Sequence, residues 1–499
     1  MSENSWQEND SYNELESLPE EACAAIAALV GDLPEASEFD EFDEVDEKPY
    51  PGFRGRRRKA ATVLVVIWGG TIALHLVTWG YWFVLGLTTL MGLHAARFLL
   101  ARPSDLPEPL SNDTRDSYPY VSLMIAAKNE EAVIGNIADR LCNLDYPSDR
   151  YEVWVIDDNS TDKTPILLDE LASQYSQLNV FHRSAEARGG KSGALNQVLP
   201  LTKGDIIVVF DADAQVEPDF LRRVVPMFDR EQVGAVQVRK AIVQAEPRFQ
   251  SKDANNFWIR GQMAEMALDA FIHQQRVAIG GVGELRGNGQ FVRRTALEQV
   301  GGWNEETITD DLDLTIRLHV NRWDVDVLTV PAVYEEGVTS AIGLWHQRNR
   351  WAEGGYQRYL DYWRLIARNR MGTRKTLDLL MFWIIQYVVP TAALPDFLMA
   401  IARSRPLLLS PLSGLTVTLF LFSMMGGLRR IQRASRVENK LRPPSKRFDF
   451  SVFVVLLQSL RGTLYMMHWL PIVASTTVRM SIRPKRLKWV KTVHRGVDD

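Results

Sequence analysis

GDIIVVFDADAQVEPDF, residues 204–220, joins a run of strand-forming apolar residues to two aspartates, Asp211 and Asp213. Ile, Val and Phe favour a strand, and side chains two residues apart point to the same side of it. If strand geometry persists to Asp213, the two carboxylates lie side by side and repel each other unless a cation is near. Mg²⁺ suits such a pair because it takes one or two carboxylates and completes its shell with phosphate oxygens. The stretch therefore predicts a strand whose end holds a divalent metal that also binds a phosphate group.

The sequence on either side repeats a pattern of strand and helix. Apolar runs such as YVSLMIAA (120–127), YEVWVID (151–157) and NVFHR (179–183) alternate with amphipathic segments. This alternation predicts an α/β fold with a parallel-rich sheet of the nucleotide-binding type. In such sheets, ligands bind outside the carboxyl ends of the strands. A lone Asp-x-Asp is more often an ordinary polar strand end, so the residues at the other strand ends decide between the two interpretations.

Polar residues follow the other strand ends as well. They are Lys128, Asn129 and Glu130 after the first strand, and Asp157 and Asp158 after the second. A glycine-rich turn in ARGGKSGALNQVL (187–199) presents Lys191 just before a predicted helix. A cation and backbone N–H groups placed in this way can stabilise phosphate. The spacing is not that of a Walker motif, which disfavours an ATPase.

The first hundred residues predict a tail and a membrane hairpin. Residues 1–50 hold sixteen Asp or Glu against one basic residue, Lys48, a composition typical of a disordered acidic tail. Residues 51–101 begin with a basic flank and continue with an apolar run twice as long as the ~20 residues that a spanning helix needs. Because arginines favour the cytoplasmic side, this hairpin should return the chain there, so that residues 102–370 form a cytoplasmic domain with an interfacial helix.

The end of the chain predicts a second membrane region, 371–480, followed by a basic tail, 481–499. Apolar runs lie near 377–402, 407–428 and 449–474. Three crossings would leave the basic tail on the outer side, against the positive-inside preference. One of the three runs should therefore be interfacial or re-entrant, and the sequence does not say which.

Two further motifs complete an ordered series. The series is KNE (128–130), DDNSTD (157–162), GGKSGALN (189–196), DAD (211–213), TDD (309–311) and QRNRW (347–351). Together these motifs, within residues 120–360, resemble the membrane-bound family 2 glycosyltransferases, a group that includes cellulose and hyaluronan synthases and glycolipid synthases. The resemblance implies a GT-A fold inserted between transmembrane helices. It also implies a nucleoside diphosphate sugar as donor, a divalent metal, and inversion at the anomeric carbon.

The resemblance assigns roles to the strand-end residues. The residues implied to hold the nucleoside are Lys128, Asn129, Glu130, Asp157 and Asp158. Lys191 would approach the diphosphate, Asp211 the ribose or the metal, and Asp213 the metal itself, Mg²⁺ or Mn²⁺. Asn159 stands where the family usually has glycine, a mild departure because asparagine also tolerates tight turns.

The last two motifs concern the base and the acceptor. By its position Asp311 would be the general base, although an aspartate here, taken alone, would be an ordinary helix N-cap. We expect its carboxyl to stay ionised at neutral pH because a helix N-terminus favours negative charge. Gln347, Arg350 and Trp351 share one helix face by their spacing. The resemblance implies that Gln347 and Arg350 contact the nucleotide sugar and that Trp351 offers an apolar plate to the acceptor, whereas an interfacial helix with an anchoring Trp would explain Trp351 alone.

Three functions fit this sequence. The first is transfer of glucose from UDP-glucose to diacylglycerol, a small lipid acceptor that needs no channel through the membrane. The second is a processive polysaccharide synthase of the cellulose or hyaluronan type, and the third is a non-catalytic membrane scaffold that retains the fold. We expect a multi-pass protein of a bacterial plasma or thylakoid membrane, whose basic residues meet anionic lipids. Nothing in the sequence indicates nucleic-acid binding.

Overall fold

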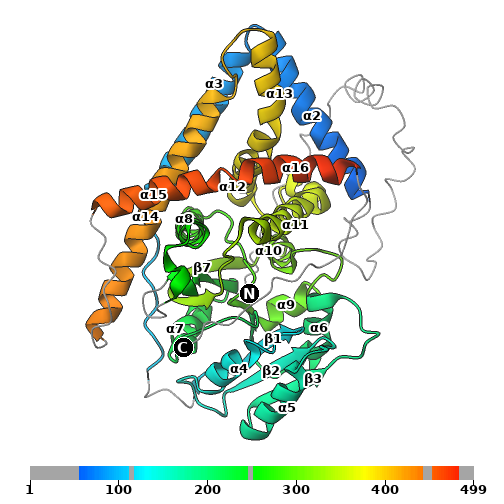
Figure 1. The fold of residues 1–499 in the computed structure, drawn as a ribbon, viewed down its shortest axis with the longest axis vertical. Helices are drawn as coiled ribbons and strands as arrows, with labels where there is room; N and C mark the ends of the chain where they lie inside the picture. The colour runs from blue at the N-terminus through cyan, green and yellow to red at the C-terminus, as the bar shows by residue number, and fades with distance from the viewer. Residues whose placement is uncertain (1–54, 112–116, 246–250, 442–451, 483–499) are drawn as a thin grey trace, which may run out of the picture. The chain divides into compact units, whose positions relative to one another are not determined.

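The computed structural model describes residues 55–111, 117–245, 251–441 and 452–482, with the side chains of 434–441 excepted. The expected acidic tail at 1–50 and nearly all of the basic tail lie outside these residues. Within the described part, an α/β domain stands between two groups of long apolar helices, one before it and one after it in the sequence (Figure 1).

A mixed sheet of seven strands forms the centre of the described α/β domain, in the order β3-β2-β1-β4-β6-β5-β7. Strands β3, β2, β1 and β4 run parallel, β6 is antiparallel to β4 and β5, and β7 is parallel to β5. The prediction of a parallel-rich α/β sheet is therefore confirmed. The strands are β1 (Val121–Ala127), β2 (Tyr151–Asp157), β3 (Leu178–His182), β4 (Ile206–Phe210), β5 (Val233–Ile242), β6 (Gln290–Arg293) and β7 (Asp324–Glu335).

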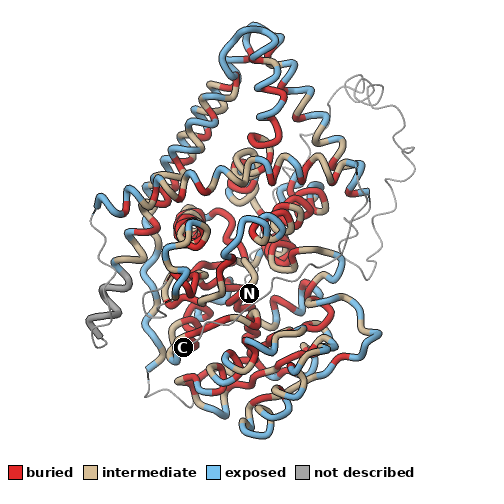
Figure 2. Tube along the Cα trace, in the orientation of Figure 1, coloured by how far each residue is buried: buried red, intermediate tan, exposed pale blue. Residues whose placement is uncertain are grey.

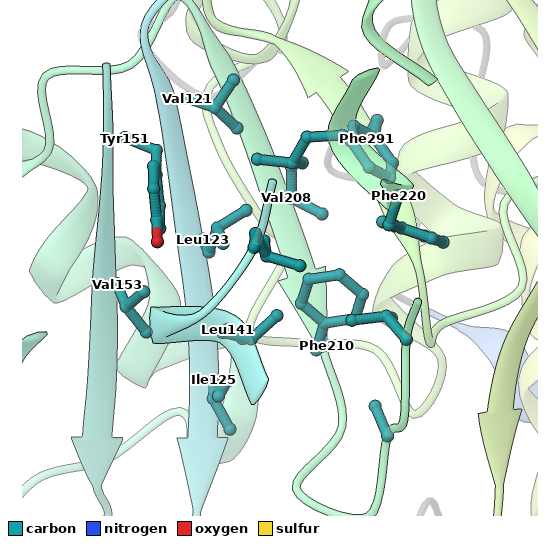
Figure 3. Close-up of a cluster of buried hydrophobic side chains, with 14 of the residues drawn as sticks. Val121, Leu123, Ile125, Leu141, Tyr151, Val153, Val208, Phe210, Phe220 and Phe291 are labelled. Carbon is teal, nitrogen blue, oxygen red and sulfur yellow. The ribbon is translucent and has the colours of Figure 1, made fainter. Parts of the chain in front are cut away.

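Both faces of the sheet are covered, which explains why the central strands read as unbroken apolar runs. In β1, Val121, Leu123 and Ile125 pack into the apolar cluster drawn in Figure 3, while Met124 belongs to a second cluster on the other face. Helices α4 (Ile134–Cys142), α5 (Thr164–Gln174) and α7 (Phe220–Val224) contribute to the first cluster. The second includes residues of α6 (Gly190–Val198), α9 (Arg294–Gln299) and α10 (Asp310–Val320).

Strand β4 ends one residue before the first aspartate of the DAD motif. Directly after it, the Ala214 N–H donates to the Asp211 carbonyl oxygen at 3.0 Å and closes a turn. Strand geometry therefore does not persist to Asp213, because the backbone turns as soon as the pairing of β4 with its neighbours stops. Gln215, just beyond the turn, pairs with Tyr334 of β7.

Four stretches of the described chain are long and apolar enough to cross a membrane. The first two, α2 (Arg56–Leu76) and α3 (Gly80–Leu99), fall where the sequence predicts a hairpin, and a Cβ on Gly80 would collide with the Leu74 carbonyl oxygen in the tight turn between them. The other two are Thr373–Ala402, which comprises α12 (Thr373–Trp383), a π-helical turn and α13 (Val389–Ala402), and Ser410–Arg433 of α14 (Ser410–Leu441). Figure 2 shows how much of these helices is exposed, as expected of surfaces that face lipid.

The apolar run predicted at 449–474 is not one of these four. It forms two shorter helices, α15 (Val452–Met466) and α16 (Trp469–Ile482), separated by a break at 467–468. They lie across the other apolar helices, with α15 against α14 and α16 against α2 and α13 (Figure 1). Each is shorter than the ~20 residues of a crossing. Which of the three runs is interfacial or re-entrant stays a prediction.

Helices α8 (Phe257–Ala278) and α11 (Ala341–Ala367) connect the sheet domain to the apolar helices. Helix α8 packs on β5 and β7 and also on α14 and α15, while α11 packs on α10 and also on α2 and α16 (Figure 1). The sheet therefore has a fixed position relative to the helices that suit a membrane.

Candidate active site

The loops that follow β1 and β2 are locked together by hydrogen bonds. The Asn129 N–H donates to Ser160 Oγ at 2.8 Å, and the Thr161 N–H donates to Asn129 Oδ1 at 2.7 Å. Asn129 and Asn159 both have left-handed backbone, with φ of 56° and 55°. Asparagine adopts this conformation more readily than most residues, so Asn159 preserves the turn for which the sequence pattern usually provides glycine.

The two aspartates at the end of β2 have different surroundings. Asp157 is buried, and its Oδ2 lies 3.0 Å from His182 Nδ1, a hydrogen bond that is the main cause of the raised pKa of His182. Asp158 pairs with Arg183, and the Lys128 amino group lies 3.7 Å from Asp158 Oδ2. The Asp158 carboxylate is more exposed than that of Asp157, so it is the better placed of the two to meet a ligand.

Arg183 is a site residue that the sequence reasoning missed. It is buried, and its guanidinium donates to the carbonyl oxygens of Arg188 at 2.6 Å and Gly190 at 3.3 Å as well as to Asp158. These bonds hold the glycine-rich turn 187–199 against the end of β2. The signal that could have found Arg183 is its place directly after β3, at the same edge of the sheet as the other polar strand ends.

Lys191 and Asp211 form an ion pair beside the start of α10. The Lys191 amino nitrogen lies 2.5 Å from Asp211 Oδ1, and the charges of Asp310 and Asp311 also act on it. Burial alone would lower the pKa of Lys191, but the three carboxylates together raise it above its ordinary value. Lys191 is therefore held as a cation, which is the state that contact with a phosphate group requires.

The turn that carries Asp211 and Asp213 is tied to neighbouring loops. Asp213 Oδ2 accepts from the Glu336 N–H at 2.8 Å, and the Asp211 N–H donates to Asn288 Oδ1 at 3.2 Å. In the part of the chain that the structure describes, no group of three or more His, Cys, Asp or Glu is placed to hold a metal ion. The two carboxylates of Asp211 and Asp213 are oxygen donors of the kind that a divalent metal takes together with substrate oxygens and water.

Asp311 begins α10 next to another carboxylate. Burial and the charge of Asp310 raise the pKa of Asp311 to about 6, against the opposing effects of the Leu312 N–H, which donates to Oδ1 at 2.8 Å, and of Lys240. The carboxyl is still mainly ionised at pH 7, but the expectation that the helix N-terminus decides its charge is wrong, because burial has the larger effect. A base with a pKa just below neutral is well matched to proton uptake at physiological pH.

Helix α11 brings Arg350 and Trp351 to these charged groups. Burial lowers the pKa of Arg350, while the charges of Asp211 and Asp311 oppose that shift, which places its guanidinium near both carboxylates. The Trp351 ring centre lies 4.9 Å from the amino nitrogen of Lys240, a lysine whose charge also reaches Asp311. Arg350 and Trp351 thus face the same region, as their spacing predicts.

Gln347 contacts a residue that the sequence reasoning did not single out. Its Oε1 accepts from Arg348 Nη1 at 2.7 Å. Arg348 is buried, pairs with Glu265 of α8, and lies 4.0 Å from the centre of the Trp351 ring. Gln347 therefore shares a helix with Arg350 and Trp351, but its side chain is hydrogen-bonded to Arg348, the residue that packs on the Trp351 ring.

The loop 284–289 links the site to a buried ion cluster. A Cβ on Gly287 of this loop would lie 3.5 Å from Asp311 Oδ2, so the loop backbone passes close to that carboxylate. At the start of the loop, Glu284 is fully buried. Its carboxylate oxygens lie 3.0, 3.0 and 3.1 Å from the guanidinium groups of Arg276, Arg286 and Arg358. Arg358 lies more than seventy residues after Arg286 in the sequence, and Arg276 and Arg286 follow no motif spacing, so the sequence did not reveal the cluster.

The structure thus gathers opposite charges at the carboxyl ends of the central strands. Two cations and three carboxylates act on one another there: Lys191, Arg350, Asp211, Asp310 and Asp311. The cations can neutralise a departing phosphate group, and a carboxylate with a raised pKa can accept a proton. Such an arrangement suits transfer of a group from a phosphate leaving group to a hydroxyl acceptor.

Comparison with known proteins agrees with this chemistry. Residues 119–354 match the family described as glycosyltransferase like family 2. A β-monoglucosyldiacylglycerol synthase of Nostoc sp. is 58% identical over 499 residues, which is 100% of both chains. Another, of Synechocystis sp., is 56% identical over 446 residues, or 89% of this chain and 90% of the relative. Among solved structures, a mannosyltransferase from Pyrobaculum calidifontis in complex with GDP-Man and Mn²⁺ aligns with 78% of this chain and 100% of its own, at a TM-score of 0.46 and 21% identity.

Asp311→Asn should lower glycosyl transfer at least ~10²-fold, because an amide cannot take the acceptor proton. Since the pKa of Asp311 is about 6, the wild-type initial rate should fall as the pH drops through that value and the carboxylate becomes protonated. Initial rates measured between about pH 5 and 8 check both points. Asp169→Asn, at a carboxylate that is 71% exposed, serves as the matched control and should keep the wild-type profile. An Asp311→Asn protein with near-normal turnover would rule out this base.

Proposed function

The chain belongs to the family of the β-monoglucosyldiacylglycerol synthases within glycosyltransferase family 2, and we propose that it transfers glucose from UDP-glucose to diacylglycerol. The observation that carries the proposal is the identity of 58% over 499 residues, because it extends through the apolar helices as well as the sheet domain. The reaction breaks the bond between glucose C1 and the UDP oxygen and forms a bond from C1 to the lipid hydroxyl oxygen. UDP leaves with the bonding electrons, and the hydroxyl proton passes to the enzyme.

The cationic side of the site suits the departing UDP. Lys191 and Arg350 lie beside Asp211, and a bound diphosphate would give both cations a second anionic partner. Donors fixed in advance where negative charge develops are the most effective form of transition-state stabilisation. The residues proposed to contact the rest of the nucleotide sugar are Lys128, Asn129, Glu130, Asp157, Asp158 and Gln347.

The acceptor side is formed by Asp311 and Trp351. Asp311 would take the hydroxyl proton of diacylglycerol as the oxygen attacks, and Trp351 would offer its ring to the glycerol end of the lipid. Helix α11, which carries Trp351, packs on α2 and α16. The ring is thus carried by a helix that contacts the apolar helices. A diacylglycerol could present its hydroxyl here with its acyl chains still in the bilayer.

Asp211 and Asp213 are proposed to hold Mg²⁺, with Mn²⁺ as a substitute. The support for this assignment is the turn that carries both carboxylates, with Asp211 paired to Lys191, because Mg²⁺ takes one or two carboxylates and completes its shell with substrate oxygens. When bound, the ion would supply charge neutralisation at the diphosphate. Lys191 and Arg350 would share that task from the protein side.

The membrane arrangement is also a proposal. The helices that suit a membrane support a multi-pass protein of the plasma or thylakoid membrane, with the sheet domain in the cytoplasm where UDP-glucose is available. Arg56 and its neighbours at the start of α2 fit this orientation. Anionic lipids are proposed as additional contacts of the basic residues that flank the apolar helices.

Membranes that contain the protein, given labelled UDP-glucose and diacylglycerol, should form one chloroform-soluble lipid that carries a single glucose. The acceptor has one free hydroxyl, so the product cannot grow by the same chemistry unless its sugar re-enters the site. Thin-layer chromatography of the extract measures this outcome, with Asp311→Asn membranes as the blank. Label in a long water-soluble or insoluble sugar chain would contradict the proposal and favour a polysaccharide synthase.

Removal of divalent ions should abolish activity, and Asp213→Asn should weaken the response to added Mg²⁺. An EDTA-treated wild type should regain its rate on titration with Mg²⁺, and the variant should need a higher Mg²⁺ concentration and turn over at least ~10²-fold more slowly. Asp219→Asn, on a carboxylate that pairs with Arg223 instead, is the control. Full activity in the presence of EDTA would count against a metal at this site.

Proteinase K added to intact cells should leave the domain at 102–370 uncut, and the same treatment of opened cells should degrade it. The reason is that a cytoplasmic domain is shielded by the membrane. Immunoblotting against the domain reads out the result. Cleavage of the domain in intact cells would overturn the proposed orientation.

A further inference from the structure

A small, partly open cavity lies between the sheet, α8 and α14. Its apolar wall comes from Ala267, Ala270 and Phe271 of α8 and from Gly427 and Ile431 of α14. The two helices approach closely here, since a Cβ on Gly427 would collide with the Ala267 carbonyl oxygen. None of these residues belongs to the candidate active site.

An irregularity of the sheet directs Arg239 into this cavity. Val238 of β5 pairs with Leu328 of β7, but Arg239 pairs with Ala332, so residues 329–331 have no partner on β5 and form a bulge. Arg239 Nε donates to the Thr329 carbonyl oxygen of the bulge at 2.9 Å, and both residues line the cavity. Because side chains alternate along a strand, Arg239 faces away from its neighbour Lys240, which contacts Trp351.

A second guanidinium reaches the cavity from α14. Arg430 lies 4.4 Å from the Phe271 ring centre and donates to the side-chain oxygens of Gln274 at 2.6 Å and Gln275 at 2.9 Å. Both glutamine oxygens are uncharged. In the described part of the chain, neither Arg430 nor Arg239 has a carboxylate within ion-pair distance. Two cations without anionic partners therefore line one cavity, which favours an anion between them.

The position of the cavity along α14 indicates where this anion comes from. Arg430 stands three residues before the end of the apolar stretch Ser410–Arg433. A basic residue at that point of a spanning helix lies at the level of the lipid headgroups.

We propose that this cavity binds the phosphodiester headgroup of an anionic phospholipid, held by Arg239 and Arg430. Planar guanidinium groups bind phosphate oxygens through paired, charge-assisted hydrogen bonds. The site is separate from the proposed glucosyl transfer, and its occupancy would hold β5, the bulge of β7, α8 and α14 together. It provides a physical reason for the enzyme to depend on the charge of its membrane.

Binding of radiolabelled dioleoylphosphatidylglycerol to the purified, delipidated full-length protein tests the proposal. The double variant Arg239→Gln/Arg430→Gln should bind this lipid at least ~10-fold more weakly than the wild type, since charge-assisted bonds to phosphate are lost. Arg429→Gln removes an exposed positive charge one residue away on the same helix and should bind like the wild type. Unlabelled dioleoylphosphatidylcholine and inorganic phosphate should compete poorly.

A second variant guards against a general loss of structure. Ala270→Leu fills the cavity but keeps both arginines, and it should also weaken binding of dioleoylphosphatidylglycerol. Glucosyl transfer in phosphatidylcholine vesicles reports folding, and it should stay near the wild-type rate in both variants. Unchanged lipid binding in both variants would overturn the proposal, as would competition by inorganic phosphate as strong as that by the lipid. Because the readout is lipid binding, a failure of the proposed reaction would leave this result interpretable.

Discussion

A single buried carboxylate, Glu284, pairs with three guanidinium groups at the junction between the sheet domain and the helices that suit a membrane. Burial by itself would raise the pKa of Glu284, but Arg358, Arg286 and Arg276 hold it well below its usual range. Removing one partner from a buried ion group typically costs about 3–5 kcal/mol, because the remaining charges lose their compensation. Arg276 also pairs with Asp378 and Arg286 with Asp269, so loss of Glu284 would remove the carboxylate partner of Arg358 and one of the two partners of each of the others. The cost should therefore fall mainly on Arg358 of α11.

The three arginines come from three different elements, so the cluster joins segments that are separate in the fold. Arg276 lies on α8, Arg286 on the loop 284–289, and Arg358 on α11. The loop passes beside Asp311 and carries Asn288, whose Oδ1 accepts a hydrogen bond from the Asp211 N–H. Helix α11 carries Arg350 and Trp351. The loop beside Asp311 and the helix that carries Arg350 and Trp351 thus both meet at Glu284. This contact links the geometry of the candidate site to the packing of the apolar helices.

The features that could be predicted from the sequence are those that depend on local pattern. Buried parallel strands give unbroken apolar runs, so the sheet and the polar residue Asp211 at a strand end can be predicted from the pattern, whereas Asp311 and Arg350 were indicated by the family resemblance. The structure brings these two residues together with Lys191 and Asp211. The turn after Phe210 could not be predicted, because the sequence DADA is compatible both with a longer strand and with a turn. The pairing of Gln215 with Tyr334 of β7 fixes the turn, and this contact between distant segments leaves no mark in the local sequence. Arg183, the Glu284 cluster and the cavity lined by Arg239 depend on contacts between distant segments, and these leave no periodic signal. The raised pKa of Asp311 likewise comes from tertiary burial, which outweighs the local effect of the helix end.

As the proposed base, Asp311 would activate a lipid hydroxyl for direct attack on the sugar carbon from the side opposite the leaving UDP. In-line displacement in one step inverts that carbon, whereas a route through a covalent glucosyl-enzyme would retain its configuration. The most direct measurement is the anomeric configuration of the glucosyl lipid formed from UDP-glucose, whose own linkage is α, determined by proton NMR of the purified product. Attack with inversion should give the β-anomer as the sole product. An α-glucosyl lipid would contradict it.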